Sequence, residues 1–213
     1  MSFVLTYNSL VEKIKNELER KNDPIVLASM DMWIKNAHER IGRDCNSLLF
    51  EVSLQGSFQV DNCVIQKPNR WQNTIAFNYG TGNGFNTYNP VYLRTYEFCR
   101  DYWPDTTQVS LPKFYADYVY GSWLISPTPD QNYPFEIVYL ETPQVIDSSF
   151  QTNYLTQFMP EILLRATLME AMVTLKNDER TPVIADDYVR LIASWNNKNK
   201  LRKFDRYTTR DAD

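Results

Sequence analysis

The chain has 213 residues, of which 43% are hydrophobic and 14% aromatic, and its formal net charge is −4. This composition excludes a disordered protein and supplies a core for one large or two small domains. Cys45, Cys63 and Cys99 are widely spaced and include no CxxC pair, so neither a disulfide framework nor a zinc site is indicated. No signal-peptide pattern is present, and no run approaches the roughly 18 apolar residues that span a membrane. We therefore expect a soluble intracellular protein with free thiols.

Charge is unevenly distributed along the chain. Residues 196–213 contain six Lys and Arg against three Asp, a balance of +3, which leaves −7 for the remainder. A basic C-terminal segment therefore follows an acidic body.

Two amphipathic helices are predicted near the N-terminus. The first covers residues 9–20 and starts with a capping-box pattern at Ser9. The second covers residues 23–42, with Pro24 in its first turn and Gly42 at its C-terminal end. Apolar residues recur at helical spacing in both: Leu10, Ile14, Leu18, Leu27, Met30, Ile34, Ala37 and Ile41.

From about residue 46 the hydrophobic period changes to that of β-strands. A glycine-rich loop at residues 80–90 lacks both a lysine and a βαβ context, so phosphate binding is not predicted. A short helix is predicted at residues 91–103. The alternating residues are Phe50, Val52, Leu54, Phe58, Val60, Val64, Gln66, Ile75, Phe77 and Tyr79.

Two further apolar runs cover residues 114–125 and 135–140. Between them lies PTPDQNYP at residues 127–134, which is dense in turn-forming residues. We predict that the two runs are strands that pair with each other in an antiparallel hairpin.

The most strongly patterned stretch lies between residues 153 and 188. Pro160 suits the first turn of a helix, and no Gly or Pro follows until Pro182. Apolar residues occupy all but a narrow strip of this helix, so we expect burial on most sides. Thr181 is then expected to cap a second helix. The pair predicts an αα-hairpin that packs on helices from elsewhere in the chain.

Together these patterns predict an α+β protein. Residues 1–45 and 149–198 each supply two helices to a helical bundle. Residues 46–148 form an inserted antiparallel β domain, and residues 199–213 form an extended C-terminal tail.

Residue types used in catalysis are present but are not grouped in a known pattern. His38, the only histidine, lies at the edge of an apolar helical face, where a packing or surface role is usual. Asp186 and Asp187 lie near a helix start, where acids favour the helix dipole. No GxSxG, HExxH or EF-hand spacing occurs. We therefore predict no enzymatic activity, no cofactor and no metal, which leaves open only a site assembled from residues distant in sequence.

The last eighteen residues are too polar to form a core of their own. A frayed tail is one interpretation. The other is a segment that folds on a partner, because aromatic residues interleaved with Arg and Lys are typical of interfaces. The residues that carry this second interpretation are Leu201, Arg202, Lys203, Phe204, Arg206 and Tyr207.

The stretch NYLTQFMPEILLRATLMEAM at residues 153–172, followed by LKNDERTPVIADDY, resembles the C-terminal helices of head-to-tail adaptor proteins of tailed bacteriophages. The similar features are an LL-rich helix after a proline, the pair Glu170 and Ala171, a charged turn, and a helix bearing Tyr188. The upstream PTPDQNYPFEIVYLETP resembles the strand pair before those helices, and WIKNAHERI resembles the second helix of the family.

The resemblance implies a structural protein of the virion neck, assembled in the host bacterial cytoplasm. Such adaptors form a ring, typically of twelve copies, between the portal protein and the tail or nozzle proteins. They extend the DNA channel, so dsDNA passes without sequence-specific binding, and no membrane is involved. Their C-terminal segment inserts against the portal, which assigns portal binding to the six tail residues named above. An acidic body agrees with free passage of DNA, because phosphate affinity comes from Lys and Arg.

Two other functions stay open. One is a hydrolase whose site is assembled across the fold. The other is a carbohydrate-binding or fibre-attachment module of a virion, in which aromatic residues of the β domain stack on sugars. The aromatic residues considered for it are Trp71, Tyr79, Tyr88, Trp103, Tyr118, Tyr120 and Trp123.

Overall fold

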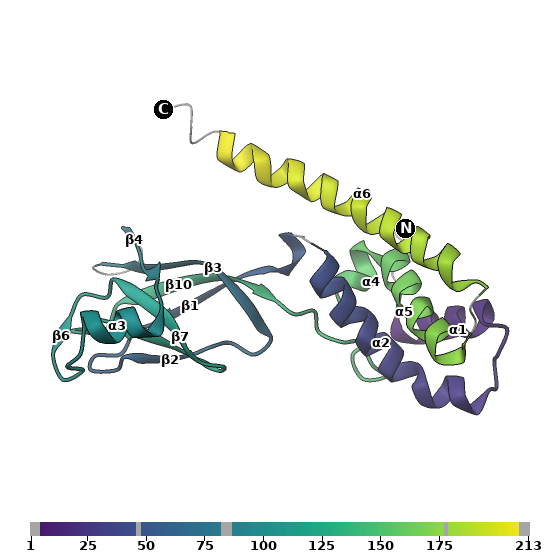
Figure 1. Cartoon of the computed structure of the whole chain (residues 1–213), viewed down its shortest axis with the longest axis horizontal. Helices are drawn as coiled ribbons and strands as arrows, with labels where there is room; N and C mark the ends of the chain where they lie inside the picture. The colour runs from purple at the N-terminus through teal and green to yellow at the C-terminus, as the bar shows by residue number, and fades with distance from the viewer. Residues whose placement is uncertain (1–4, 46–47, 82–86, 177–178, 209–213) are drawn as a thin grey trace. The chain divides into compact units, whose positions relative to one another are not determined.

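Helices from both ends of the chain come together in one unit, and the strands between them form another. The computed structural model describes residues 5–45, 48–81, 87–176 and 179–208, with side chains described up to residue 200. The helical unit comprises Met1–Phe50 and Thr142–Asp213, and the β unit comprises Glu51–Glu141. Figure 1 shows the elements along the chain. The predicted α+β class, with helices at both ends and an antiparallel sheet between them, is confirmed.

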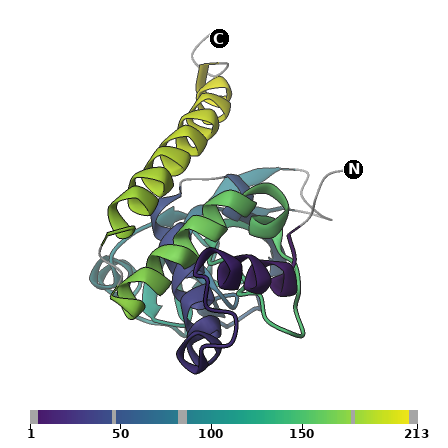
Figure 2. The same cartoon turned by 90° about the vertical axis from the view of Figure 1, so that its right-hand side faces the viewer.

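The helical unit is built around α5, which packs against both α2 and α6. Its elements are α1 (Tyr7–Glu17), α2 (Pro24–Asp44), the 3-10 turn Leu48–Phe50, α4 (Tyr154–Phe158), α5 (Pro160–Leu175) and α6 (Thr181–Thr208). Figure 2 shows this unit with α6 as its longest helix. As predicted, α5 starts at Pro160 and is buried on most sides. The buried residues are Ile162, Leu163, Ala166, Thr167, Leu168, Ala171 and Met172.

Helix α1 starts earlier than the sequence pattern predicted. Its N-cap is Thr6, whose hydroxyl oxygen accepts a hydrogen bond from the backbone N–H of Ser9 at 3.2 Å. The hydroxyl oxygen of Ser9 accepts in turn from the backbone N–H of Thr6 at 2.8 Å. Ser9 is therefore the last residue of the capping box, and its assignment as the first is wrong.

Helix α2 starts as predicted, with Asp23 as N-cap and Pro24 in the first turn. It continues to Asp44, so Gly42 lies inside the last turn and does not end the helix. A Cβ atom at Gly42 would lie 3.3 Å from Cδ of Pro143. This glycine therefore serves the close approach of Pro143, which the sequence pattern did not reveal.

Helix α6 differs most from the prediction. Thr181 is its first helical residue instead of its N-cap, and the backbone stays helical to Thr208. The extended tail predicted from residue 199 is therefore wrong over residues 199–208, and residues 209–213 lie outside the described part. No Gly or Pro follows Pro182, and Lys, Leu and Arg are good helix formers, so the helix propagates through its polar end.

The β unit contains two four-stranded sheets. The first has the order β1 (Glu51–Ser57), β10 (Pro134–Glu141), β3 (Trp71–Gly80) and β4 (Tyr88–Pro90). The second has the order β2 (Val64–Gln66), β8 (Ser122–Ser126), β7 (Phe114–Val119) and β5 (Tyr92–Leu93). A short pair joins β6 (Val109–Ser110) to β9 (Thr128–Pro129). The pairs β5–β7 and β6–β9 are parallel, and the other described pairs are antiparallel.

The hairpin predicted from residues 114–140 is wrong. Residues 114–126 already form a hairpin, β7 and β8, closed by the two-residue turn Tyr120–Gly121. Strand β10 pairs with β1 and β3 in the other sheet. The apolar run hid this short turn, although a glycine between two apolar segments is a recognised turn signal.

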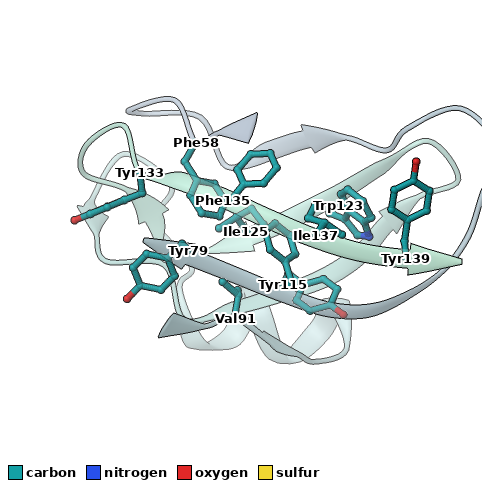
Figure 3. Close-up of a cluster of buried hydrophobic side chains, with 11 residues drawn as sticks. Phe58, Tyr79, Val91, Tyr115, Trp123, Ile125, Tyr133, Phe135, Ile137 and Tyr139 are labelled. Carbon is teal, nitrogen blue, oxygen red and sulfur yellow. The ribbon is translucent and has the colours of Figure 1, made fainter. Parts of the chain in front are cut away.

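An aromatic core lies between the two sheets (Figure 3). Phe77 of β3 has its ring centroid 5.8 Å from that of Trp123 in β8 and 5.2 Å from that of Tyr115 in β7. Strand β8 is buried along its whole length because α3 (Tyr96–Tyr102) covers its other face, where Leu124 clusters with Cys99. The short helix predicted at residues 91–103 is thus present in its second half.

Ile75 was expected to share the buried face of β3 with Phe77, but its side chain is 48% exposed. The register with β10 shifts at this point, because Ala76 pairs with Val138 while Thr74 pairs with Tyr139. Ile75 is the extra residue of this irregularity, so it turns outward.

Candidate interaction site

Helix α6, which carries the predicted partner-binding residues, is anchored by buried apolar and polar contacts. Ile184, Tyr188 and Ile192 are buried one turn apart along the helix. The Tyr188 hydroxyl donates to Oδ2 of Asp44 at 2.8 Å, and Nδ2 of Asn196 donates to the Asp44 carbonyl at 2.9 Å. Burial, reinforced by the hydrogen bond to Asp44, raises the pKa of Tyr188, so the phenol stays a donor at neutral pH.

Asp187, in the first half of α6, has a structural role. The Asp187 carboxylate accepts a hydrogen bond from Arg190 and lies 3.9 Å from Nε of Arg165 in α5. These contacts tie the first half of α6 to α5. Because α6 starts at Thr181, neither Asp186 nor Asp187 lies in its first turn, so their interpretation as acids that favour the helix dipole is wrong.

A groove separates the start of α5 from the middle of α6. Its volume is about 260 Å³. The side chain of Phe158, on one wall, is 55% exposed although it is apolar. The lining residues are Phe158, Met159, Pro160, Glu161, Ile162, Leu191, Ser194, Trp195 and Lys198.

The predicted partner-binding residues fall in the last turns of α6. The backbone there is helical, so this segment continues the anchored helix instead of forming a separate ribbon. Their side chains lie outside the described part of the structure, so which of them come together is not shown. The residues are Leu201, Arg202, Lys203, Phe204, Arg206 and Tyr207.

His38 is buried in a hydrogen-bonded junction within the helical unit. Its Nδ1 lies 2.7 Å from the Ile34 carbonyl and its Nε2 lies 3.0 Å from Nδ2 of Asn153. With the proton on Nδ1, the ring donates to Ile34 and accepts from Asn153. The amide of Asn153 also donates to the Gln144 carbonyl at 2.6 Å. Burial lowers the pKa of His38, which favours the neutral ring in this packing role.

Groups suited to metal binding do not gather in the described part of the chain. No cluster of three or more His, Cys, Asp or Glu occurs there. Cys45, Cys63 and Cys99 are free thiols, and burial raises the pKa of Cys45 and of Cys99. Among the described helices, none is long and apolar enough to cross a bilayer.

The sequence pattern missed an exposed aromatic surface on the β unit. Tyr96 of α3 stacks on Tyr118 of β7, with centroids 5.6 Å apart, and Arg100 lies over both rings. On the same helix Phe98 stacks on Tyr102, and both rings contact Phe114 edge-on; Arg94 lies over Phe98 and Phe114. The sequence feature that could have revealed this surface is the helical spacing of four between Tyr96 and Arg100 and between Phe98 and Tyr102.

The aromatic residues considered for sugar binding are divided by the fold. Tyr79 and Trp123 belong to the core, whereas Tyr88 and Tyr118 are exposed and Tyr120 is 96% exposed at the β7–β8 turn. They therefore do not form one platform.

The net charge of the chain lies in the β unit. Residues 51–141 contain five Lys and Arg against nine Asp and Glu, a balance of −4. The remaining residues contain 17 of each sign, because the whole chain has 22 and 26. The acidic body predicted from sequence is thus mainly the β unit, and the helical unit balances its basic end internally.

The comparison with protein families finds a match over almost the whole chain. No curated protein matches the sequence. A sequence profile of the family described as "SU10 adaptor protein" matches residues 5–212, which include both units and all of α6. The chain therefore belongs to the SU10 adaptor protein family.

Proposed function

We propose that this protein is a head-to-tail adaptor in the virion neck of a tailed bacteriophage, where it joins the portal protein to tail or nozzle proteins. The observation that carries the proposal is the match of the adaptor family over residues 5–212. The role is structural, and assembly takes place in the cytoplasm of the host bacterium.

The portal contact is assigned to the end of α6. In this proposal Leu201, Phe204 and Tyr207 are the apolar anchors of the contact. Arg202, Lys203 and Arg206 supply its positive charge. A helical segment that carries both apolar and basic residues suits an apolar groove with an acidic rim. Because the backbone is already helical, less conformational entropy is lost on binding.

The adaptor is proposed to form a ring of twelve copies that extends the DNA channel. Each contact in such a ring joins two different faces of neighbouring copies, and the exposed aromatic surface around Tyr96 and Phe98 provides one face. The β unit has a balance of −4, so it offers DNA phosphates little to bind. This supports passage of dsDNA without sequence-specific binding.

The portal assignment is tested with the double variant Phe204→Ala, Tyr207→Ala. Binding to portal-bearing heads is measured by co-sedimentation, and the neck is viewed by electron microscopy. A single interface hot spot contributes about 2 kcal/mol, or about 30-fold in affinity, so loss of two anchor residues should weaken binding by at least about 30-fold. Truncation after Lys200 should have at least the same effect, while it leaves the groove residues of α6 in place.

Tyr120→Ala is the matched control, because it removes an exposed aromatic side chain far along the chain from α6. It should bind heads like the unchanged protein. If the double variant also binds normally, the portal assignment is wrong. If the unchanged protein forms no coaxial ring on portals, the adaptor role itself fails, and a ring of another size would reject only the number twelve.

A sugar-binding role is the second candidate, favoured by the nearly complete exposure of Tyr120. Binding of the isolated protein to a glycan array, abolished by Tyr120→Ala, would support it. Absence of binding to every glycan would leave the adaptor role as the remaining proposal.

A further inference from the structure

One side of the β unit leaves the space between its two sheets open. Strands β4 and β5, separated only by Val91, end the two sheets there, and we call this the β5 side. Strand β4 pairs only with residues 78–80 of β3, and beside the rest of β3 a hollow of about 350 Å³ opens toward β5. The core residues Phe77 and Tyr115 line this hollow. Leu93 pairs with Tyr115 and also lines the hollow, yet its side chain is 55% exposed.

Five apolar side chains around this opening are between 39% and 55% exposed. Three of them line the hollow, and the other two, on α3, adjoin them through the ring of Phe114, which pairs with Tyr92. A whole aromatic side chain covers about 200 Å², so the three aromatic members of the set alone leave about 270 Å² in solvent. Together the five reach the few hundred Å² that indicate an interaction surface. They are Ile75, Tyr92, Leu93, Phe98 and Tyr102.

The opposite side of the β unit also leaves a core-facing leucine in solvent. Strands β1 and β2, joined by residues 58–63, end the two sheets there, and we call this the β1 side. Leu54 of β1 pairs with the core residue Ile137, and its side chain is still 37% exposed. Val60, in the connection to β2, is 47% exposed. Strand β1 contains neither Pro nor Lys, which commonly protect a sheet edge, so a covering partner is indicated.

The β1 side is acidic. Residues 51–66 and 114–141, which include β1, β2 and β10, contain six Asp and Glu but no Lys or Arg. Asp61 follows Val60 in the connection from β1 to β2, and Glu136 of β10 lies next to β1. No cation of the described residues lies within ion-pair distance of either carboxylate. Both carboxylates can therefore pair with cations of another molecule.

The β5 side carries cations instead. Lys113 is exposed, and the guanidinium of Arg94 lies over the Phe98 ring within the apolar surface. In the part of the chain that the structure describes, neither cation has an ion-pair partner, and the α3 acids Glu97 and Asp101 also lie beyond that distance. Because like charges placed opposite each other disfavour association, the β5 side suits an acidic surface better than a copy of itself.

We propose that the β5 side of one copy binds the β1 side of the next copy. Leu54 of one copy then packs at the hollow beside Leu93 of its neighbour, and the two unpaired cations meet the two unpaired carboxylates. Each contact covers an opening on both copies. The two sides lie at opposite ends of the strand order, so the contact joins unlike faces, as a closed ring requires. The choice of a second copy as partner rests on the proposed ring.

Disulfide formation between full-length chains tests which sides meet. Leu54→Cys and Leu93→Cys are placed on separate chains in a Cys63→Ser background, because the other two cysteines are buried. The two chains are mixed in concentrated solution, without portals, with oxidised glutathione as the oxidant. The disulfide between positions 54 and 93 should form at least about tenfold more than that between Leu93→Cys and the control Tyr120→Cys. Tyr120 is 96% exposed, so random collision alone would favour the control.

Equal yields of the two disulfides, or no disulfide between positions 54 and 93, would overturn the proposal. A predominant disulfide between two copies of position 93 would also overturn it, because the β5 side would then bind its own kind. Failure here is distinguishable from failure of the adaptor role. A coaxial ring on portals without the disulfide would reject only this contact, and the disulfide without such a ring would reject only the adaptor role.

Charge reversal provides an independent measurement in analytical ultracentrifugation. The variants Arg94→Glu, Lys113→Glu and Asp61→Lys, Glu136→Lys should each self-associate at least about tenfold more weakly, because like charges then face each other. An equal mixture of the two variants should recover the association of the unchanged protein to within about threefold, because alternating copies restore opposite charges at every contact. Unchanged association of either variant alone, or no recovery in the mixture, would contradict the contact.

Discussion

The helical unit and the β unit are stabilised in different ways. In the helical unit, polar pairs join segments far apart in sequence: Nε1 of Trp33 donates to Oγ1 of Thr174 at 2.8 Å, and Nε of Arg40 donates to Oε1 of Glu170 at 2.9 Å. In the β unit the core between the sheets is mainly aromatic. The β unit also carries all of the net charge, whereas the helical unit is balanced.

One cation of the β unit shows the contrast. The Lys67 side chain is only 5% exposed, and its Nζ lies 3.8 Å from the ring centroid of Trp71 and 2.9 Å from Oδ1 of Asp117. The Trp71 ring thus helps to stabilise the buried charge of Lys67 through a cation–π contact. In the helical unit the charge of Arg40 is stabilised by the carboxylate of Glu170.

This difference matches what each unit has to do. Hydrogen bonds and ion pairs are directional, so they set the positions of helices along one another, which suits the anchoring of α6. Burial of aromatic rings is less directional but contributes a large free energy of folding. We therefore expect loss of a core ring to unfold the β unit, and loss of a polar pair to loosen the helical unit.

The largest effect is expected for Trp123→Ala. Trp123 is fully buried, and its removal should lower the free energy of unfolding of the β unit by about 3–5 kcal/mol. Near-ultraviolet circular dichroism, which reports the aromatic core, should be lost at a lower temperature than the helical signal at 222 nm. Tyr120→Ala is the control and should change stability by less than about 0.5 kcal/mol. If both signals are lost together in Trp123→Ala, the two units unfold as one and the comparison fails.

An intermediate effect is expected for Glu170→Ala in the helical unit. The change leaves Arg40 and Asn36 without their carboxylate partner, which should cost about 1–3 kcal/mol. Glu39→Ala is the control, because Glu39 is exposed and lies 4.0 Å from Lys35, a pair worth less than about 0.5 kcal/mol. The melting temperature of the 222 nm signal distinguishes them. Equal melting temperatures for the two variants would show that the Arg40–Glu170 pair does not stabilise the unit.

The smallest effect is the response of the helical unit to acid. Burial lowers the pKa of His38 in the folded state, so the unfolded chain binds the proton more readily. The stabilisation is complete above the unfolded pKa of about 6.5 and is lost as the pH falls toward the folded pKa. Between pH 8 and pH 5 the melting temperature of the 222 nm signal should therefore fall less in His38→Gln than in the unchanged protein. Identical pH profiles would assign the acid response to other groups.

Much of the helical architecture was predictable from the sequence, because helices depend on local signals. Asp23 and Pro24 start α2, and Pro160 starts α5, through contacts with residues a few positions away. The family resemblance likewise rests on the stretch around α5. The prediction for the end of α6 was wrong because it relied on the polar composition of this segment. It gave too little weight to the absence of any residue that stops a helix.

Strand pairing and the buried polar contacts join residues that are distant in sequence, so only the tertiary structure decided them. Strands β8 and β10 are close neighbours along the chain, yet they belong to different sheets. His38 meets Asn153 across 115 positions, and the groove brings Phe158 to Trp195. Hydrophobic period and capping report only on neighbours within a few residues, so the sequence by itself determined the elements and the basic end of the chain. Which strands pair, which polar groups meet and where an apolar groove opens are set by burial between distant segments, and only the folded chain shows them.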